Sequence, residues 1–237
     1  MDSSSTVARG VLARIVQEND IHGIIFDLDG TLTHTLNEHV EAFIRVFSSH
    51  GFHVDRATIE NNMGRRPPDI TRDLIFNGKP DDELDEKSRT LLYQMASEKI
   101  QTFRSLIPVK PPILPGLPSL LDQAKTLGLK LAVCSSTPLQ NVTIILERIG
   151  LLQYFDALVT AEDVRVGKPD PEAFLKAAEK LGLQKSHVLV IGDSIHDVKG
   201  AMQGGLKIIA VATGKHDVST LEATHPLATI HTLADLL

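Results

Sequence analysis

Acidic side chains follow two short apolar runs in this sequence, at the point where each run ends. Asp27 and Asp29 close the first run, and Asp193 closes a later one, with Asp197 four residues further on. If both runs are parallel strands, their carboxyl ends lie at one edge of a sheet, where open α/β sheets bind ligands. Carboxylates gathered there repel one another unless a cation joins them. The pattern therefore indicates a site for a hard divalent cation such as Mg²⁺, which prefers oxygen ligands.

Two further strand ends would add hydroxyl groups and a positive charge to the same edge. Ser135 and Ser136 follow one apolar run, and Lys168 lies in a Gly-Lys-Pro segment that follows another. Each residue taken alone has an ordinary interpretation, because Asp and Ser often cap helices and a lysine is usually a solvated surface group. Together and in chain order, these carboxylates, hydroxyls and one ammonium indicate a single catalytic site.

The elements that must position these residues alternate along the chain. Apolar runs rich in Val, Ile and Leu predict strands at 21–28, 129–135, 157–160, 187–193 and 207–213. Apolar residues spaced by three and four predict helices at 117–127, 139–149, 171–181 and 197–203, and the short segments 228–231 and 233–237 complete the core. This alternation predicts βαβ units, hence an α/β fold with a Rossmann-like, doubly wound parallel sheet.

One long insert interrupts the alternation. Residues 35–113 carry only helical patterns, over 38–50, 56–63, 70–76 and 82–106. The proline-rich segment 108–118 at its end resists helix and suits a hinge. We therefore expect an α-helical cap domain at 35–113, inserted into a catalytic core formed by 21–34 and 114–237, after an N-terminal helical extension at 1–20.

The composition is that of a folded, mildly acidic protein. The chain has 237 residues, 42% hydrophobic and 23% charged, with 24 basic and 30 acidic side chains and a net charge of −6. These values exclude disorder as the main state and argue against general nucleic-acid binding. The single cysteine, Cys134, excludes an internal disulfide and a cysteine-based zinc site. No run approaches the ~18 apolar residues of a membrane helix, so we expect a cytoplasmic protein, a monomer or weak dimer.

The N-terminal residues allow two interpretations. Val11, Leu12, Ile15 and Val16 recur at helical spacing, which predicts a short amphipathic helix packed on the core. The serines and arginines of this stretch would also suit an organelle transit peptide, although its acidic residues suit one less well. The stretch lacks the basic start and long apolar region of a secretory signal.

Four short motifs carry a resemblance to a known family. Asp-Leu-Asp-Gly-Thr at 27–31, Cys-Ser-Ser at 134–136, Gly-Lys-Pro-Asp-Pro at 167–171 and Gly-Asp-Ser-Ile-His-Asp at 192–197 resemble, in order, the motifs of the haloacid dehalogenase superfamily. The helical insert resembles its C1-type cap. The layout is most similar to the phosphoglucomutase-like and phosphoglycolate-phosphatase-like members, over nearly the whole chain from residue 21.

The resemblance implies a role for each carboxylate. Asp27 would be the nucleophile that forms an aspartyl-phosphate, and Asp29 would protonate the leaving oxygen and then activate water. Mg²⁺ would be held by the Asp27 carboxylate, the Asp29 backbone carbonyl and Asp193. Asp197 would be a further ligand or an acceptor behind these ligands, and a purely structural role for it also stays open.

The resemblance also assigns the phosphate contacts. Lys168 would place a positive charge between the nucleophile and the phosphoryl oxygens. Ser135, with the backbone N–H of Ser136, would hold a phosphoryl oxygen, although Ser136 could have only a structural role.

Candidate substrate contacts lie in the cap. In caps of this type a glycine-containing loop reaches into the active site, and residues 61–69 match its location. Arg65 and Arg66 are therefore candidates to bind the leaving group, although two solvated arginines would fit as well. His39 matches a histidine common on the first cap helix, and a packing role is equally compatible. His34 departs from the family, whose members usually carry Asp there, and this departure leaves the substrate open.

The implied activity is that of a Mg²⁺-dependent phosphatase of a small phosphorylated metabolite, with no nucleic-acid or membrane partner. A sugar phosphomutase would use the same residues and return the phosphoryl group to a substrate, so the motifs leave both open. A regulatory protein without turnover is disfavoured by the intact acidic and lysine residues. Dehalogenation is disfavoured because it needs neither a proton donor nor a metal. Phosphonate cleavage is disfavoured because in this family it uses a cap lysine as a Schiff base, and no matching lysine is identified.

Overall fold

Six parallel strands form one sheet in the order β3-β2-β1-β4-β5-β6, in a computed structural model that describes residues 10–237. The strands are β1 (Gly23–Phe26), β2 (Lys130–Cys134), β3 (Ala157–Val159), β4 (Val188–Gly192), β5 (Lys207–Val211) and β6 (Ala228–Ile230). The order reverses at β1, because β2 and β3 extend to one side of it and β4 to β6 to the other. The predicted doubly wound α/β fold is therefore confirmed, and its ligand crevice lies beyond the ends of β1 and β4.

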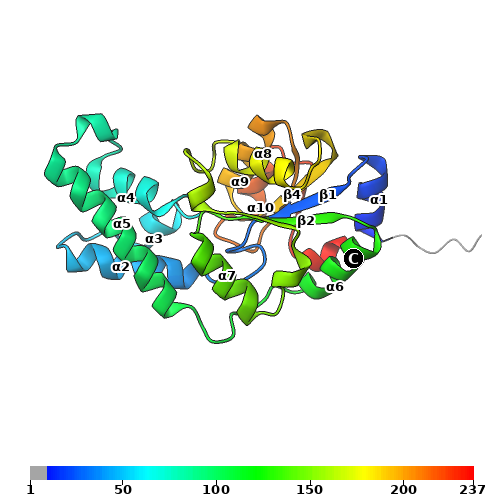
Figure 1. The fold of residues 1–237 in the computed structure, drawn as a ribbon, viewed down its shortest axis with the longest axis horizontal. Coiled ribbons are helices and arrows are strands. Elements are labelled where there is room, and N and C mark those ends of the chain that lie inside the picture. The colour runs from blue at the N-terminus through cyan, green and yellow to red at the C-terminus, as the bar shows by residue number, and fades with distance from the viewer. Residues whose placement is uncertain (1–9) are drawn as a thin grey trace, which may run out of the picture.

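The strands are short and apolar because the sheet is covered on both faces. One face packs under α6 (Leu117–Thr126), α7 (Leu139–Arg148) and η5 (Leu233–Leu236). The other packs under α8 (Glu172–Lys180), α9 (Ile195–Gly204) and α10 (Val218–Glu222) (Figure 1). Short 3-10 helices η2 (Leu152–Tyr154), η3 (Ala161–Asp163) and η4 (Lys185–His187) complete the connections.

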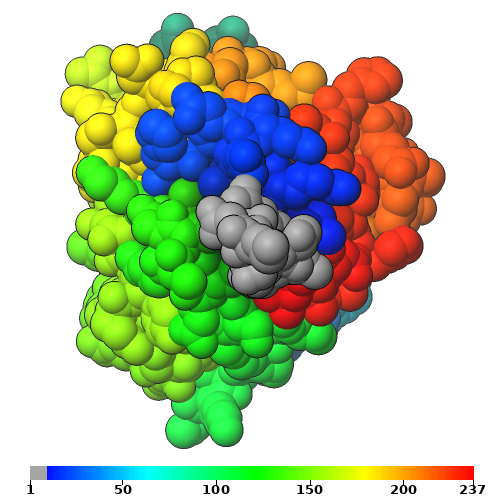
Figure 2. Space-filling model, turned by 90° about the vertical axis from the view of Figure 1, so that its right-hand side faces the viewer, coloured from blue at the N-terminus to red at the C-terminus, as the bar shows by residue number. Residues whose placement is uncertain are grey.

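The N-terminal helix α1 spans Val11–Glu18 and closes one end of the core. Its Leu12 is fully buried in the cluster that covers α6 and η5. Figure 2 shows this helix in blue, beside the green segment that contains α6 and the red C-terminal segment. Residues 1–9, which carry much of the alternative transit-peptide interpretation, lie outside the described residues.

The insert forms a separate helical body at the far end from α1 (Figure 1). It consists of α2 (Leu36–Ser49), α3 (Arg56–Glu60), α4 (Pro67–Phe76), η1 (Asp81–Glu83) and α5 (Glu86–Leu106). It has its own apolar cluster, in which Phe43, Phe47 and Ile70 are buried. Within residues 10–237 no helix combines the length and apolarity that crossing a bilayer requires.

Candidate active site

The first carboxylate leaves the sheet directly after β1. The backbone N–H of Asp27 still donates to the carbonyl of Ile191 on β4, at 2.9 Å. Asp193 follows β4 at the same edge, so the two carboxylates flank the crevice where the strand order reverses. Both side chains are buried, with 6% of Asp27 and 4% of Asp193 exposed. The convergence expected from the sequence is therefore present.

Lys168 joins the carboxylates from the loop after β3. Its Nζ donates to Asp27 Oδ1 at 2.6 Å and to the Cys134 carbonyl at 2.9 Å, and it pairs with Asp197 Oδ1 at 2.7 Å. Burial alone would lower the pKa of Lys168, but Asp197 and Asp27 together raise that pKa well above its usual value. The ammonium is therefore permanently charged. The thiol of Cys134 is buried and its pKa is raised to about 12, so it is inert packing.

Three buried carboxylates face this one ammonium. Ligand oxygens of Asp27, Asp193 and Asp197 lie within 4.8 Å of one another. Burial raises the pKa of Asp27 to about 7, with Lys168 opposing the rise and Asp197 adding to it. Burial, Asp27 and Asp197 likewise raise the pKa of Asp193 well above its usual value. Positive charge is thus in deficit here, and the all-oxygen donor set fits a divalent cation such as Mg²⁺.

Glycines at two positions let the backbone approach the Asp193 carboxylate closely. Gly30 has a φ of +97°, and a Cβ built on it would lie 2.5 Å from Asp193 Oδ2. A Cβ on Gly214, in the loop after β5, would lie 1.7 Å from the same oxygen. Any side chain at either position would displace the carboxylate. Thr31 Oγ1 fixes that carboxylate from the other side, donating to Asp193 Oδ1 at 2.9 Å.

Asp197 contacts both Lys168 in the site and Ser194 at the start of its own helix, α9. Its Oδ2 accepts from Ser194 N at 3.1 Å and from Ser194 Oγ at 2.6 Å, which forms a capping box at the start of α9. Its Oδ1 pairs with Lys168. Both interpretations of Asp197 are therefore compatible with its contacts.

Asp29 lies in a different electrostatic setting, two residues after Asp27. Its Oδ1 accepts from Thr35 Oγ1 at 2.5 Å and lies 3.2 Å from His39 Nε2, and its Oδ2 accepts from Thr137 Oγ1 at 3.2 Å. Burial favours a higher pKa for Asp29, but His39, Thr35 and nearby Lys99 outweigh it and lower the pKa. The environment thus separates the pKa values of the two carboxylates, and the lowered pKa of Asp29 keeps that carboxylate in the ionised form that accepts a proton.

The two serines after β2 take different positions. Ser135 is buried, and its Oγ accepts from the backbone N–H of Thr137 at 3.1 Å. Ser136 Oγ donates to the carbonyl of Gly64 in the cap loop, at 2.8 Å. Both line the small cavity above Asp27, which we call the catalytic cavity. The hydroxyl of Ser136 therefore also connects core and cap.

The cap contributes a buried lysine to this cavity that the sequence analysis did not identify. Lys99 of α5 is 2% exposed, and its Nζ lies 2.5 Å from His39 Nδ1. It also lies 4.7 Å from the centroid of the Phe43 ring and 5.0 Å from that of Phe103. Burial lowers the pKa of Lys99 to about 7, although Asp29 opposes this. The absence of a matching cap lysine is therefore no longer an argument against phosphonate cleavage.

A signal for Lys99 was present in the sequence. The buried residues of α5 recur at helical spacing, and the lysine occupies one of these positions: Leu92, Met95, Ala96, Lys99 and Phe103. A lysine on the apolar stripe of a helix is costly unless it has a partner, so it deserves a functional interpretation.

His39 connects the cap lysine to the acid–base residue. Its ring stacks on Phe103 with the centroids 3.5 Å apart, and its two nitrogens face Lys99 and Asp29. Burial and Lys99 lower the pKa of His39, while Asp29 opposes the shift. His39 therefore lies in the site, and its ring also packs against Phe103.

The two candidate arginines separate in space. Arg65 lines the catalytic cavity, and its Nη1 pairs with Asp73 at 2.6 Å. Arg66 instead donates from Nη1 to the carbonyls of Val164 at 3.2 Å and Arg165 at 2.8 Å, and from Nε to Asp69 at 2.8 Å. It is not among the residues that line the catalytic cavity. Its guanidinium attaches the cap to the segment that leads into Lys168.

Known proteins match most of this chain. The model of haloacid dehalogenase-like hydrolases matches residues 21–205. Phosphorylated carbohydrates phosphatase of Thermotoga maritima is 30% identical over 192 residues, covering 80% of this chain and 84% of that protein. Validoxylamine A 7'-phosphate phosphatase of Streptomyces hygroscopicus subsp. limoneus is 29% identical over 200 residues, covering 83% and 88%. The crystal structure of a hydrolase from Pseudomonas syringae has a TM-score of 0.79 at 28% identity, covering 91% of this chain and 95% of its own.

Proposed function

The chain belongs to the haloacid dehalogenase-like hydrolase family, as its motifs indicated, and we propose that it is a Mg²⁺-dependent phosphatase acting through an aspartyl-phosphate on Asp27. That it is a phosphoric monoester hydrolase follows from the family and from its phosphatase relatives. The observation that carries the mechanism is the contact between Lys168 Nζ and Asp27 Oδ1 at 2.6 Å, beside two more buried carboxylates. The ammonium orients the nucleophile and offsets the charge of an arriving phosphate dianion.

Mg²⁺ would be held by the carboxylates of Asp27 and Asp193 and by the backbone carbonyl of Asp29, with Asp197 adjoining. When bound, the ion supplies positive charge that lets an anionic nucleophile approach an anionic ester. Lys168 adds a second positive charge on the same carboxylate.

The remaining steps belong to residues of the chain. Asp27 attacks phosphorus, and Ser135 Oγ and the backbone N–H of Ser136 orient a phosphoryl oxygen. Asp29 transfers a proton to the leaving oxygen and then takes one from the water that hydrolyses the aspartyl-phosphate. The low pKa of Asp29 in this arrangement suits the second step, and Thr35 and His39 hold the carboxylate in place for it.

The substrate class we propose is a small phosphorylated metabolite rich in hydroxyl groups. Two relatives are named for phosphorylated carbohydrates and for validoxylamine A 7'-phosphate. Arg65, His39 and Lys99 line the catalytic cavity from the cap and are placed to contact a polar leaving group. That the protein is a monomer or weak dimer stays a prediction.

The deciding experiment measures inorganic phosphate released from a panel of phosphate esters, with Mg²⁺ and with EDTA, for the wild type and Asp27→Asn. We expect Mg²⁺-dependent release that falls at least about 1,000-fold in Asp27→Asn. Release that survives EDTA or the substitution would exclude this mechanism. Conversion of one sugar phosphate into another without net phosphate release would instead identify a phosphomutase.

Lys99 favours a second candidate, the cleavage of a phosphonate with a neighbouring carbonyl group. An amine with a pKa of about 7 is partly unprotonated at neutral pH and can attack a carbonyl carbon to form a Schiff base. Formation of the Schiff base releases water, and borohydride added with a 2-oxoalkylphosphonate would then reduce the imine and add to Lys99 the mass of the carbonyl compound less one oxygen atom. An unchanged mass of the peptide that contains Lys99 would eliminate this candidate and leave the phosphatase standing.

A further inference from the structure

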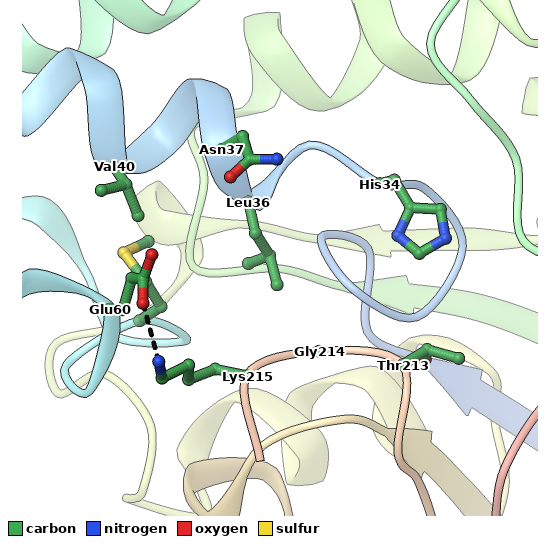
Figure 3. Close-up of a pocket in the computed structure, with 9 residues that line it drawn as sticks. His34, Leu36, Asn37, Val40, Glu60, Thr213, Gly214 and Lys215 are labelled. Carbon is green, nitrogen blue, oxygen red and sulfur yellow. Dashed lines mark hydrogen bonds and ion pairs between the residues drawn. The ribbon is translucent and has the colours of Figure 1, made fainter. Parts of the chain in front are cut away.

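The two edges of the sheet carry different groups. The carboxyl edge holds the active site and faces the cap, where Lys215 of the loop after β5 pairs with Glu60 of α3 at 2.7 Å, drawn as the dashed line in Figure 3. The amino edge lies at the end of the molecule where α1 packs, away from the cap (Figure 1). Three side chains that could hold a metal ion gather there: Asp20, His22 and His187. None of them takes part in the chemistry proposed above.

Strand register places the two histidines side by side. Gly23 and Val188 are the first paired residues of β1 and β4, and His22 and His187 precede them. The backbone N–H of His22 donates to the carbonyl of His187 at 2.8 Å. Residues opposite each other in parallel strands direct their side chains to the same face. The two imidazoles are accordingly stacked, with centroids 4.6 Å apart and planes 7° apart, close to the ~4.8 Å between neighbouring strands. The sheet backbone therefore fixes both rings in position.

Asp20 brings oxygen atoms to the same place. It lies between α1 and β1 with a φ of +53°, a left-handed conformation in which Asp is several-fold enriched. Its Oδ1 lies 3.1 Å from His22 Nε2, and its Oδ2 lies 3.0 Å from His187 Nδ1. Its backbone carbonyl oxygen lies 2.9 Å from the same Nδ1. One nitrogen of each ring and the oxygens of one residue thus converge.

These separations suit a transition-metal ion. Zn²⁺ binds imidazole nitrogen and carboxylate oxygen at about 2.0–2.2 Å, so ligand atoms of a tetrahedral site lie roughly 3.3 Å apart. The nitrogen–oxygen pairs lie at 3.0 and 3.1 Å, and the three ligand atoms lie within 4.8 Å of one another. Because parallel rings direct their lone pairs along parallel lines, each ring has to turn slightly toward the ion. The exposed fractions of 53% for His22 and 28% for His187 leave room for this turn and for water as a further ligand.

The donor set selects a different class of cation from that of the active site. Neutral imidazole suits Zn²⁺, Cu²⁺ and Ni²⁺, whereas Mg²⁺ prefers oxygen ligands alone. The carboxylates at the carboxyl edge are such an oxygen set. Without a metal, each ring donates a hydrogen bond to Asp20. Metal binding would replace these hydrogen bonds with metal–ligand bonds and move each ring proton to the opposite ring nitrogen or to solvent.

We propose that Asp20, His22 and His187 form a second metal site, specific for a divalent transition-metal ion of the Zn²⁺ class. The site joins the turn after α1 to the residue before β4, which are 167 positions apart in the chain. A bound ion would therefore stabilise the attachment of α1 and the pairing of β1 with β4. Because the site lies at the opposite edge of the sheet, it would leave the reaction at Asp27 unchanged.

The test is a Zn²⁺ titration in competition with a zinc-binding dye. It is carried out in Asp193→Asn, because the active-site carboxylates can also bind Zn²⁺. Addition of Asp20→Asn, which keeps the shape and tolerates left-handed backbone, should weaken binding of one Zn²⁺ at least about 10-fold. Addition of His22→Phe, which keeps a ring to stack, should do the same. His53→Phe, at an exposed position of the cap, is the control and should bind Zn²⁺ as the parent does.

The choice of ion is tested in the same titration. Affinity should rise from Co²⁺ to Ni²⁺ to Cu²⁺, and an excess of Mg²⁺ of about 100-fold should not displace Zn²⁺. Displacement by Mg²⁺ would contradict an imidazole site. Equal Zn²⁺ affinity in the parent, Asp20→Asn and His22→Phe would reject the site outright.

Two further measurements test its separation from the active site. Zn²⁺ should raise the unfolding temperature of Asp193→Asn, and the rise should be lost with Asp20→Asn. Mg²⁺-dependent phosphate release by His22→Phe, made in the wild-type background, should equal that of the wild type. A fall in that release would overturn the proposal that the two edges act independently.

Discussion

Core and cap each bury one lysine beside the catalytic cavity, and the two are opposites electrostatically. Lys168 in the core lies between Asp27 and Asp197, and its pKa is raised well above the usual value. Lys99 in the cap lies against His39 and two phenylalanine rings, and its pKa is lowered to about 7. The exposed fraction is 2% for both. Neighbours rather than burial therefore decide which lysine is charged.

This difference suits the two parts to different tasks. The core must hold a constant positive charge on Asp27, since the nucleophile is needed in every cycle. The cap meets the leaving group only while it is closed. An amine with a pKa near 7 is partly unprotonated at neutral pH, and an anionic ester beside it would favour the protonated form. A permanently charged lysine at this buried position would cost more desolvation free energy whenever the cap is closed without a substrate.

The largest effect is expected from removing the core lysine. Lys168→Met leaves three buried carboxylates without their cation. Breaking a buried ion pair in this way costs about 3–5 kcal/mol of unfolding free energy, and phosphate release should fall at least about 1,000-fold. Denaturant unfolding and the phosphate assay measure both, with exposed Lys199→Met on α9 as the control. If Lys168→Met unfolds at nearly the same denaturant concentration as wild type, Lys168 is not held as a charged partner of the carboxylates, and it does not differ from Lys99 in the way described above.

The cap lysine should behave in the opposite way. Between pH 7 and 10.5 the unfolded chain holds a proton on Lys99 that the folded chain has lost, so wild-type stability rises with pH through this window. Lys99→Met removes this dependence. The variant should be more stable than wild type at pH 7, by on the order of 3 kcal/mol, and the advantage should vanish toward pH 10.5.

Unfolding in denaturant at pH 7, 8.5 and 10 measures this crossover. Lys87→Met, an exposed position on the same helix, provides the matched control, and its stability should rise with pH as that of wild type does. A destabilised Lys99→Met at every pH would mean that the lysine is held as a charged partner, like Lys168. Activity should fall about 10–100-fold in Lys99→Met, because a contact to the leaving group is lost.

We expect Mg²⁺ to stabilise the protein by binding to carboxylates of the core, without a contribution from cap residues. Binding to the native state stabilises by about 2.7 kcal/mol when the ion is at 100 times its dissociation constant. Thermal unfolding with Mg²⁺ and with EDTA should show this gain in wild type and in Lys99→Met, and its loss in Asp193→Asn. A gain that persists in Asp193→Asn would place the ion elsewhere.

The core half of the site was predictable because topology does the positioning. Asp27, Ser135, Lys168 and Asp193 each follow a strand or the loop after one, and parallel strands bring such residues to one edge whatever the loop details. The reversal of strand order at β1 then determines where along this edge the ligand crevice lies. Sequence order and strand pattern were sufficient for this result.

The cap half was not predictable for a physical reason. Which cap residues meet the core depends on how two rigid bodies dock, and helical periodicity carries no information about that orientation. Arg65 and Arg66 are adjacent in sequence, yet one lines the catalytic cavity and the other bonds to the carbonyls of Val164 and Arg165. Lys99 could be recognised only as a lysine on an apolar stripe, without its neighbours across the interface.

The smallest effect is expected from a substitution that weakens the attachment of the cap to the core. Arg66→Ala removes the bonds to the two core carbonyls and to Asp69, while the carboxylates of the active site and both buried lysines keep their own contacts. We expect a loss of about 1 kcal/mol in unfolding free energy and a kcat lowered about 3–10-fold, because a less firmly seated cap positions its residues less well. Stabilisation by Mg²⁺ should be unchanged, since the ion's ligands lie in the core.

Arg66→Lys makes this last comparison more specific. Its ammonium keeps the charge near Asp69 but cannot supply the planar fork that reaches Asp69 and the two carbonyls together. A variant that behaves like Arg66→Ala assigns the effect to the geometry of the fork, and one that behaves like wild type assigns it to charge. If instead KM rises for every ester and kcat stays constant, Arg66 contacts the substrate, as the sequence first suggested, and the cap is held closed mainly by Ser136 with Gly64 and Lys215 with Glu60.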